Sequence, residues 1–418
     1  MLIEKVIGRE IIDSRGNPTL EVEISLENGI KRYASVPSGA SVGMEEAVEL
    51  RDYDPERYHG MGVTKSIDVL NNLIIPAVNR SKVQSLRELD QLVIEIDGTD
   101  NKSKVGANTS LAMSLAFAKC LAAYNDVPLY KVISEEYKNL FRMEIIDFKS
   151  PTPMLNVING GKHADNGLVL QEFMIVPTIN ANIQEKIRIS CEFFSELKDT
   201  IYGMGHSTNV GDEGGFAPLL SSAYDALDLL MEVLAKDRYR GCFKFAIDGA
   251  ASTFYDQKNK TYNLYEDDED PITNEDMVHF YKQLISEYPI LSLEDPIAED
   301  DLVGWKMITE EIGKKVMLVG DDLFVTNTKN LQHGIENGLG NAILIKPNQI
   351  GTITETIKAV HLARSNGYEV IVSHRSGETE DNSLSHVAVG LGASYIKAGA
   401  PCRSERVAKY NELIRIFS

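Results

Sequence analysis

The pattern that governs the fold is clearest in Ala342-Ile-Leu-Ile-Lys-Pro-Asn-Gln-Ile-Gly-Thr352, where a short apolar run stops at a lysine. Apolar runs of this length indicate strands that are buried on both faces. Other runs in the second half of the chain stop in the same way: Phe243–Ile247 at Asp248, Ile290–Leu293 at Glu294, Val316–Val319 shortly before Asp321, Val370–Val372 at Ser373, and Tyr395–Ile396 at Lys397. Because the carboxyl ends of the strands face the active site in a parallel α/β barrel, the sequence predicts that these side chains meet at one end of a barrel.

Composition limits the classes of partner. The chain has 418 residues, and its 42 basic and 62 acidic residues give a formal net charge of -20. A length of this order corresponds to about two or three domains. The acidic balance argues against nucleic acid, which needs a basic surface, and against anionic membranes. The field of the whole protein also opposes an anionic substrate, so a site for such a substrate must be locally positive.

The cysteines and the first residues indicate a compartment. Cys120, Cys191, Cys242 and Cys402 lie far apart, which favours free thiols in a reducing environment. Charges within the first ten residues stand where a signal peptide needs an apolar stretch, and no run approaches the ~18 apolar residues of a membrane span. We therefore expect a cytoplasmic protein without a membrane partner. A secondary pool at the cell surface or outside the cell is left open.

The first part of the chain is typical of an α+β domain. Polar and apolar residues alternate over Leu20–Leu26 as in a half-buried strand, and Asn28-Gly29 predicts a hairpin into Ile30–Val36. With Val6–Ile12, these strands predict a three-stranded antiparallel meander. Helical patterns follow, with apolar residues at helical spacing over Val63–Ile74 and an Ala/Leu/Met-rich stretch over Thr109–Tyr124.

The domain boundaries follow from this change of pattern. We expect a smaller domain over residues 1–135, and the charged residues 136–150 predict an irregular linker at the start of a second domain over 136–418. There strands alternate with amphipathic helices, and strand ends from Glu294 onward recur at roughly 30-residue steps, as expected for eight βα units. Thr352 to Glu355 fits a capping box at the start of one helix. The expected fold class is α/β, a TIM-type barrel preceded by the smaller α+β domain.

Three of the strand ends supply carboxylates: Asp248, Glu294 and Asp321. Hard cations such as Mg²⁺ take oxygen ligands, so three carboxylates would hold one ion and leave positions for substrate. Each acid taken alone could be a solvated loop residue. Three acids that each end a buried strand favour a metal site.

Lys346 and Lys397 end two further strands. A lysine beside a metal site at a low-dielectric strand end is expected to have a lowered pKa, which suits a general base. Either lysine could instead be a salt-bridge partner of the carboxylates. Two lysines indicate an anionic substrate as well.

The loops contain the remaining candidates. Gly211–Pro218 is Gly-rich and carries the paired acids Asp212 and Glu213. Near a second acid, Glu172, one of these carboxyls could have a raised pKa, and a protonated carboxyl can donate a proton to a leaving group. Alone, this stretch favours a flexible turn. Arg375 stands among hydroxyls, and its fork suits phosphate, although a surface ion pair is the alternative. The Gly-containing loops around His163 and over Ser38–Ser41 could close over a ligand, but each is a weak signal.

Taken together, these motifs resemble the enolase (phosphopyruvate hydratase) family over nearly the whole chain. The resemblance runs from Ile11–Pro18 to Arg403–Asn411. Its most specific segments are Ile343-Leu-Ile-Lys-Pro-Asn-Gln-Ile-Gly-Thr352, Gly211-Asp-Glu-Gly-Gly215, Leu293-Glu-Asp-Pro296 and Ser373-His-Arg-Ser-Gly-Glu-Thr379. It implies a barrel with an antiparallel ββαα opening. It also implies a lyase that reversibly dehydrates 2-phospho-D-glycerate to phosphoenolpyruvate in glycolysis and gluconeogenesis.

The resemblance further implies roles for single residues. Lys346 would abstract the C2 proton and Glu213 would protonate the leaving hydroxyl. The other implied assignments are a first Mg²⁺ on Asp248, Glu294 and Asp321, a second Mg²⁺ on Ser38, phosphate contacts from Arg375 and Ser376 with His374 nearby, the substrate carboxylate at Lys397, and further substrate contacts from His163, Gln171 and Glu172. Two Mg²⁺ ions per active site would stabilise the doubly charged intermediate while a lysine takes the proton.

Two alternatives to this interpretation stay open. A paralogue could act on a close analogue of the same small phosphorylated three-carbon acid. An inactive binding or structural protein on the same scaffold should have lost a group such as Glu213 or Lys346, and both are present. The resemblance also implies a homodimer or an assembly of dimers.

Overall fold

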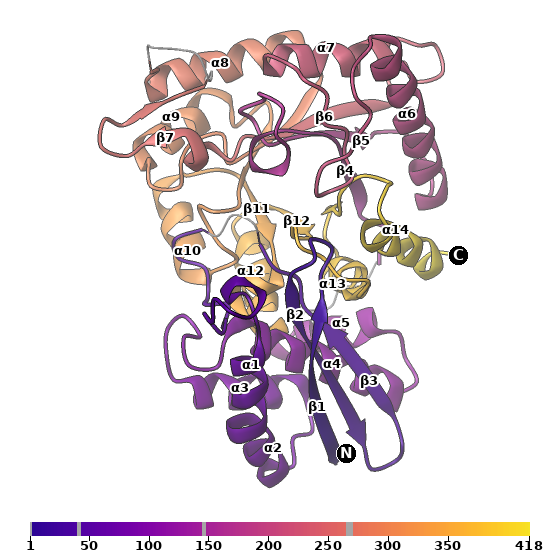
Figure 1. Ribbon diagram of the computed structural model, residues 1–418, viewed down its shortest axis with the longest axis vertical. Helices are drawn as coiled ribbons and strands as arrows, with labels where there is room; N and C mark the ends of the chain where they lie inside the picture. The colour runs from indigo at the N-terminus through magenta and orange to yellow at the C-terminus, as the bar shows by residue number, and fades with distance from the viewer. Residues whose placement is uncertain (1, 40–42, 144–147, 265–270) are drawn as a thin grey trace.

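The computed structural model describes residues 2–39, 43–143, 148–264 and 271–418 (Figure 1). The first part of the chain is a sheet of three antiparallel strands with helices packed on it, and the second part is a closed barrel surrounded by helices. We call them the N-terminal unit (β1–β3 and α1–α5) and the barrel unit (β4–β13 and α6–α14). In Figure 1 the N-terminal unit, indigo to purple, lies below the barrel unit.

The predicted meander is confirmed. Its strands are β1 (Ile3–Ile12), β2 (Pro18–Leu26) and β3 (Lys31–Ser35), and each is antiparallel to the next. The β2–β3 turn lies at Asn28-Gly29, where Gly29 has a φ of 86°. This left-handed conformation suits glycine, and it lets the Gly29 N–H donate to the Leu26 carbonyl at 2.9 Å.

The helices of the N-terminal unit cover this sheet. They are α1 (Thr64–Val69), a π-helical turn (Leu70–Ile74), α2 (Ile75–Ser81), α3 (Leu86–Asp97), α4 (Ala107–Tyr124) and α5 (Leu129–Phe141). The helices expected near Val63–Ile74 and Thr109–Tyr124 are therefore confirmed. Most of α4 is buried, because it packs on β2 and β3 and also touches α3 and α5.

The linker prediction is wrong for residues 136–141, because α5 continues to Phe141. Ile133 and Tyr137 on one face of α5 are buried, and the Phe141 ring stacks on His361 with ring centroids 3.6 Å apart. Packing against the barrel unit therefore extends the helix beyond the point where the charged sequence predicts irregular structure. Residues 144–147 of the expected linker, and Ser41 of the expected loop, lie outside the described residues.

The barrel closes in the strand order β10-β11-β12-β13-β4-β5-β6-β9. Strand β5 is antiparallel to both of its neighbours, and the other neighbouring pairs are parallel. Two helices follow β4 and β5, which confirms the expected ββαα opening. The barrel strands are β4 (Thr152–Asn159), β5 (Glu172–Pro177), β6 (Phe243–Asp248), β9 (Ile290–Glu294), β10 (Met317–Gly320), β11 (Ala342–Ile345), β12 (Glu369–Ser373) and β13 (Tyr395–Lys397).

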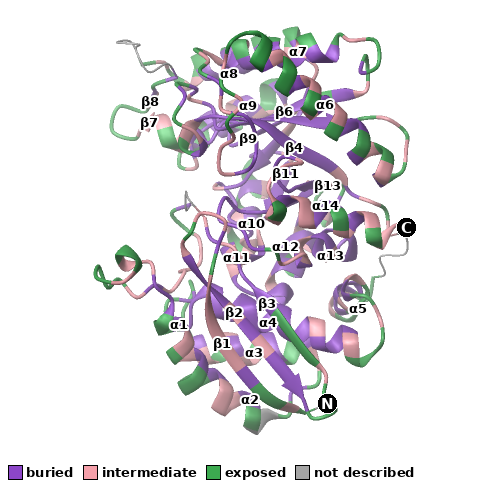
Figure 2. Cartoon of the chain, turned by 45° about the vertical axis from the view of Figure 1, so that its right-hand side comes forward, coloured by how far each residue is buried: buried purple, intermediate pink, exposed green. Residues whose placement is uncertain are grey.

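Helices surround the barrel, and a short hairpin of β7 (Tyr255–Asp256) and β8 (Thr261–Tyr262) projects from it. The helices are α6 (Ile183–Gly203), α7 (Ala223–Leu234), α8 (Asn274–Glu287), α9 (Leu302–Ile312), α10 (Thr328–Asn337), α11 (Pro347–Ile350), α12 (Ile353–Ser365), α13 (Ser383–Gly390) and α14 (Ser404–Ile416). In Figure 2 the strands of the barrel are mostly buried, whereas the outer faces of the helices are exposed.

The barrel strands alternate between two apolar layers. Ala246, Val319 and Leu344 belong to a small cluster that fills the barrel, and the residues next to them belong to the layer under the helices. Because side chains alternate along a strand, the second residue after an inward-facing one faces inward again. Asp248, Asp321 and Lys346 are the second residues after Ala246, Val319 and Leu344, so they lie on the inward-facing side at the end of their strands. The packed core therefore ends in a layer of charged side chains.

Two further expectations concern the cysteine thiols and membrane-spanning segments. All four cysteines are free, as predicted. Within the described ranges, none of the helices combines the length and the apolar content that crossing a bilayer requires.

Helix α12 begins where the two units meet. Thr352 Oγ1 accepts from the Glu355 N–H at 3.1 Å, which confirms the N-cap half of the predicted capping box. The Glu355 carboxylate accepts from the Thr352 hydroxyl, in place of the Thr352 N–H that a capping box uses, and from Lys102 Nζ. The carboxylate of Asp90, on α3, accepts from the Thr354 N–H at 2.9 Å. Burial raises the pKa of Asp90 to about 7.

We predict that Asp90→Asn removes a pH-dependent part of the stability. The raised pKa means that the folded protein holds a proton that the unfolded chain releases, so the free energy of unfolding falls as the pH rises from about 4 to about 7. The negative charge of Glu355, which pairs with Lys102, also contributes to raising the pKa of Asp90. Urea unfolding at about pH 5 and about pH 8 should show the variant gaining stability over the parent at the higher pH. Equal pH slopes for the two proteins would contradict the assignment.

Candidate active site

The strand ends bring most of the predicted side chains into one buried pocket. Its lining includes the predicted residues His163, Gln171, Glu172, Glu213, Asp248, Asp321, Lys346, His374, Arg375, Ser376 and Lys397. Glu294 lies beside them in contact with Lys397, and Ser38 lies next to Gly377 at the edge of the pocket. The reversed direction of β5 explains the position of Glu172, because the first residue of β5 pairs with Asp248 at the end of β6.

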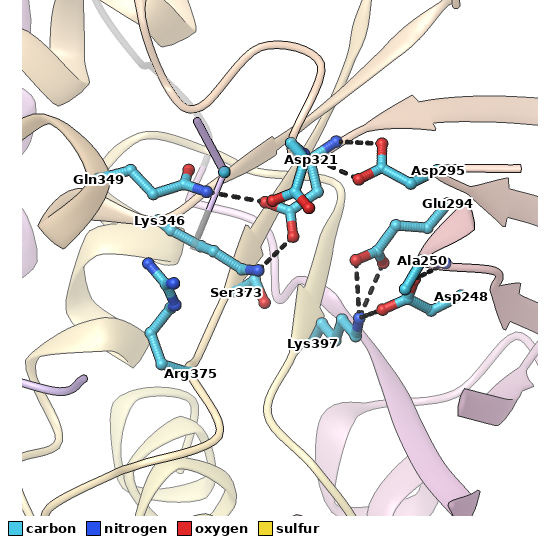
Figure 3. A network of polar contacts seen from close by, with 12 residues as sticks. Asp248, Ala250, Glu294, Asp295, Asp321, Lys346, Gln349, Ser373, Arg375 and Lys397 are labelled. Carbon is cyan, nitrogen blue, oxygen red and sulfur yellow. Dashed lines mark hydrogen bonds and ion pairs between the residues drawn. The ribbon is translucent and has the colours of Figure 1, made fainter. Parts of the chain in front are cut away.

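Lys397 is the centre of the first charge network (Figure 3). Its Nζ lies 3.0 Å from Asp248 and 2.8 Å from Glu294, as Figure 3 shows. The same nitrogen lies 2.9 Å from Glu172. Burial alone would lower the pKa of Lys397, but the three carboxylates outweigh it and hold the pKa well above its ordinary value. These contacts favour the charged form of Lys397, which balances the buried carboxylates.

Lys346 is the centre of the second network. Its amine pairs with Asp321, and Asp321 also accepts from Gln349 Nε2 at 2.9 Å (Figure 3). The hydroxyl of Thr326 donates to Gln349 Oε1 at 2.8 Å and accepts from the Lys346 N–H at 2.9 Å. The expectation of a lowered pKa for Lys346 is wrong in this arrangement. Burial acts to lower it, but the Asp321 carboxylate outweighs burial and the pKa is raised.

A third network surrounds Glu213. His374 Nε2 lies 3.1 Å from one Glu213 oxygen, and the Asn156 amide donates to the same oxygen at 3.1 Å. Arg406 donates to His374 Nδ1 at 2.6 Å. Since arginine can only donate, Nδ1 is the acceptor, and a neutral His374 ring therefore carries its proton on Nε2.

The two carboxyls of this region differ in proton affinity. Burial and the charge of Glu213 raise the pKa of Glu172 well above its ordinary value. Burial also acts to raise the pKa of Glu213, but His374 and His163 outweigh it and hold that pKa well below its ordinary value. His163 Nδ1 lies 3.4 Å from Glu172 and 3.9 Å from Glu213. The His163 imidazole therefore lies between Glu172, whose protonated form is favoured, and Glu213, whose ionised form is favoured.

The residues predicted to bind the substrate phosphate lie where the barrel unit contacts the N-terminal unit. Arg375 reaches both oxygens of Glu46, at 2.9 and 3.1 Å, and both side chains are buried. Arg15 reaches the Ser376 hydroxyl at 3.4 Å. Two charged groups on this side of the pocket, Glu46 and Arg15, are therefore supplied by residues that precede the barrel unit.

Ser38 is held by a close approach of two backbones. Its N–H donates to the Gly377 carbonyl at 2.8 Å, the Gly377 N–H donates back at 2.9 Å, and the Ser38 hydroxyl donates to Asp13 at 3.0 Å. A Cβ at Gly377 would lie 2.6 Å from Asp13 Oδ2 and 2.8 Å from the Ser38 carbonyl oxygen. Only glycine fits here, so this contact holds Ser38 against the loop that follows β12.

The donor set suits a hard divalent cation. Two groups of three residues each bring ligand atoms within 4.8 Å of one another: Asp295, Asp321 and Asp322, and His163, Glu172 and Glu213. Burial and neighbouring carboxylates raise the pKa of Asp295 and Glu294 well above their ordinary values, and that of Asp322 to about 8. Among the expected ligands, Asp321 belongs to the first group, while Asp248 and Glu294 face Lys397. Oxygen donors with this excess of negative charge fit a cation such as Mg²⁺.

Sequence reasoning missed several contributors to the site. Arg406 is fully buried and donates to His374 and to the carbonyls of Arg375 and Ser376. Gln349 of α11 donates to Asp321. Glu46 of the N-terminal unit pairs with Arg375. Arg406 and Gln349 fall within the segments that resemble a known family, but no local pattern marks them, because their partners are remote in sequence.

The fold and the site define an enzyme of the α/β-barrel class that carries acid–base groups and a cluster of oxygen ligands at its strand ends. Two family models match the chain: "Enolase, N-terminal domain" over residues 3–133 and "Enolase, C-terminal TIM barrel domain" over residues 147–418. The enolase of Ehrlichia chaffeensis is 49% identical over 416 residues, which cover 99% of this chain and 96% of that protein. The enolases of Ehrlichia canis and of Ehrlichia ruminantium strain Welgevonden are 48% identical over the same shares.

The chain belongs to the enolase family. It is a phosphopyruvate hydratase, a lyase that reversibly dehydrates 2-phospho-D-glycerate to phosphoenolpyruvate. Membership in the family implies a divalent metal, and the acidic clusters described above can hold one.

We predict that Lys397→Met strongly destabilises the protein in chelator. The variant leaves three buried carboxylates without their cation, and breaking a buried ion pair in this way costs roughly 3–5 kcal/mol of unfolding free energy. Lys282→Met is the matched control, because Lys282 pairs with Glu311 at 2.7 Å at an exposed position, where solvent screens the charges and the loss of the pair changes stability little. Urea unfolding measures both. Similar losses in the two variants would show that Lys397 does not carry the buried charge balance.

Proposed function

We propose that Lys346 is the general base and Glu213 the general acid of the dehydration. The observation that carries this proposal is their separation into two networks of the same pocket, Lys346 with Asp321 and Glu213 with His374. A dehydration needs one group that accepts a proton and another that donates one. Separate networks allow the two groups to hold opposite protonation states at the same moment. The pKa of Lys346 is raised and that of Glu213 is lowered, which are the protonation states that the forward dehydration leaves behind and from which the reverse hydration starts.

The proposed proton balance is as follows. Neutral Lys346 takes the proton from C2 and becomes an ammonium ion. The electron pair of the broken C–H bond forms the C2–C3 double bond, and the C3 hydroxyl leaves with a proton from Glu213 as water. Glu213 ends as a carboxylate. His163 and Glu172 lie beside Glu213, and we assign them the role of holding the required proton in reserve, in keeping with the raised pKa of Glu172.

We further propose that Asp248, Glu294 and Asp321 hold one Mg²⁺ and that Ser38 belongs to the site of a second. When bound, two such cations would neutralise the carboxylate charge that keeps Lys346 protonated and would stabilise negative charge on the substrate carboxylate. The wrong expectation about the pKa of Lys346 fits this proposal, because the cause of its raised pKa is Asp321, one of the proposed ligands.

The remaining side chains are assigned to the substrate. Arg375 and Ser376, with His374 nearby, would bind the phosphate, because the planar guanidinium offers paired donors to phosphate oxygens. Lys397 would bind the substrate carboxylate, and Gln171 would contact the substrate. The phosphorylated three-carbon acid is an anion, so these cationic groups counter the overall charge of -20.

We also propose a cytoplasmic location and a homodimer or an assembly of dimers. Residues 1–135 would form the N-terminal domain and residues 136–418 the barrel domain, with α5 crossing that boundary as far as Phe141. Size-exclusion chromatography with light scattering tests the assembly, and a monomeric mass would contradict it.

We predict that two substitutions separate the acid from the base. Lys346→Ala should abolish exchange of the C2 proton of 2-phosphoglycerate with solvent, and Glu213→Gln should retain this exchange while lowering dehydration by roughly 10²–10⁴-fold. Proton exchange is followed by NMR in deuterium oxide, and dehydration by the absorbance of the enol product. If Lys346→Ala retains proton exchange and Glu213→Gln abolishes it, the acid and base assignments are reversed.

Removal of divalent metal is predicted to abolish turnover. Exhaustive chelation should reduce the rate to background, and added Mg²⁺ should restore it, because the buried carboxylates cannot lower the barrier without a cation. A dialysed sample with the chelator removed and without added metal serves as the control for residual metal. A full rate in excess chelator would contradict the two-metal proposal.

A further inference from the structure

The first turn of α12 depends on the N-terminal unit. The N–H groups at a helix start have no partner within the helix and need one from outside. The Ile353 N–H donates to Ser114 Oγ of α4 at 3.1 Å, and the Thr354 N–H donates to the carboxylate of Asp90 at 2.9 Å. Both acceptors are buried and belong to helices of the N-terminal unit. Two of the N–H groups of this turn are therefore satisfied across the contact between the units.

The segment before α12 is held in the same way. The Ala47 N–H donates to the Gln349 carbonyl at 2.9 Å. Gly351 has a φ of 97°, and a Cβ there would lie 3.2 Å from the Cα of Ala107. Lys102 pairs with Glu355 at 2.9 Å at the far end of the segment. The N-terminal unit therefore contacts residues 346–355 along their length.

The same segment carries part of the reaction site. It begins at Lys346, whose N–H is held by Thr326, and it includes Gln349, whose amide orients Asp321. Lys346 and Ile353 are separated by little more than the short helix α11. A shift at the start of α12 is thus transmitted to Lys346 and Gln349 through a few residues that have little freedom to absorb it.

We propose that Asp90 and Ser114 are positioning residues for the reaction: by capping α12 from the N-terminal unit, they hold the segment that places Lys346 and Gln349. Neither residue touches the substrate pocket. The inference rests on the proposed role of Lys346 as the base. It gives the N-terminal unit a part in the proton-abstraction step that is separate from its contacts to Arg375 and Ser376.

The test compares four variants as Mg²⁺-loaded enzymes: Asp90→Ala, Ser114→Ala, Asp90→Asn and Thr273→Ala. The last is a matched control, because Thr273 caps α8 with its side chain at a helix remote from this segment. Displacement of a catalytic group by about 1 Å can cost up to 10²-fold in rate. We expect Asp90→Ala to lower kcat and C2-proton exchange by roughly ten- to a hundredfold with KM changed less than about twofold, and Ser114→Ala to do the same to a smaller extent.

Two further measurements separate positioning from general stability. Asp90→Asn should restore most of kcat, because the amide oxygen can accept from the Thr354 N–H. Amide hydrogen exchange should become faster over residues 346–355 in Asp90→Ala and remain unchanged there in Thr273→Ala. This pattern would support the proposal even if Asp90→Ala folds poorly, because Ser114→Ala and Asp90→Asn report on the same turn.

Two outcomes would overturn the proposal: faster amide exchange over 346–355 with kcat unchanged, or equal loss of kcat in Asp90→Ala and Thr273→Ala. The base assignment fails on a different result, namely C2-proton exchange that survives in Lys346→Ala. In that case a loss of kcat in Asp90→Ala together with faster amide exchange would still support the control of this segment by the cap.

Discussion

Buried carboxylates at the mouth of the barrel require matching positive charge, and the arrangement of the site follows from this requirement. Lys397 balances Glu172, Asp248 and Glu294, while Lys346 balances Asp321. Glu294, Asp295 and Asp322 still have raised pKa values, so the two amines do not compensate all of the negative charge. The remaining imbalance is what makes a divalent cation a fitting partner for this end of the barrel.

Barrel architecture explains why these charges meet. Inward-facing residues recur every second position, so the filled interior ends in Asp248, Asp321 and Lys346 at the same end of the barrel. The antiparallel strand β5 adds Glu172 from its first residue. A uniformly parallel barrel would place the start of that strand at the opposite end. The reversed strand thus supplies a carboxyl beside Glu213 and His163, where we propose that the proton transfer takes place.

The site is also a product of two structural units. The loop after β12 meets Ser38 in a backbone contact that excludes any side chain at Gly377, and Glu46 binds Arg375. At α12, Asp90 and Ser114 complete the first turn of a barrel helix. Through these contacts, groups that surround the pocket are held in place by the N-terminal unit.

Local periodicity in the chain was sufficient to predict the meander, the alternation of strands and helices, the Thr352 cap and the side chains that end the barrel strands, because each depends on neighbours within a few residues. It failed where long-range contacts dominate. The extent of α5 follows from packing against His361, and the raised pKa of Lys346 follows from pairing with Asp321. The burial of Arg406 beside His374 and the capping of α12 by Asp90 likewise join residues remote in sequence. Such pairings depend on distances and burial in three dimensions, which a one-dimensional pattern does not contain.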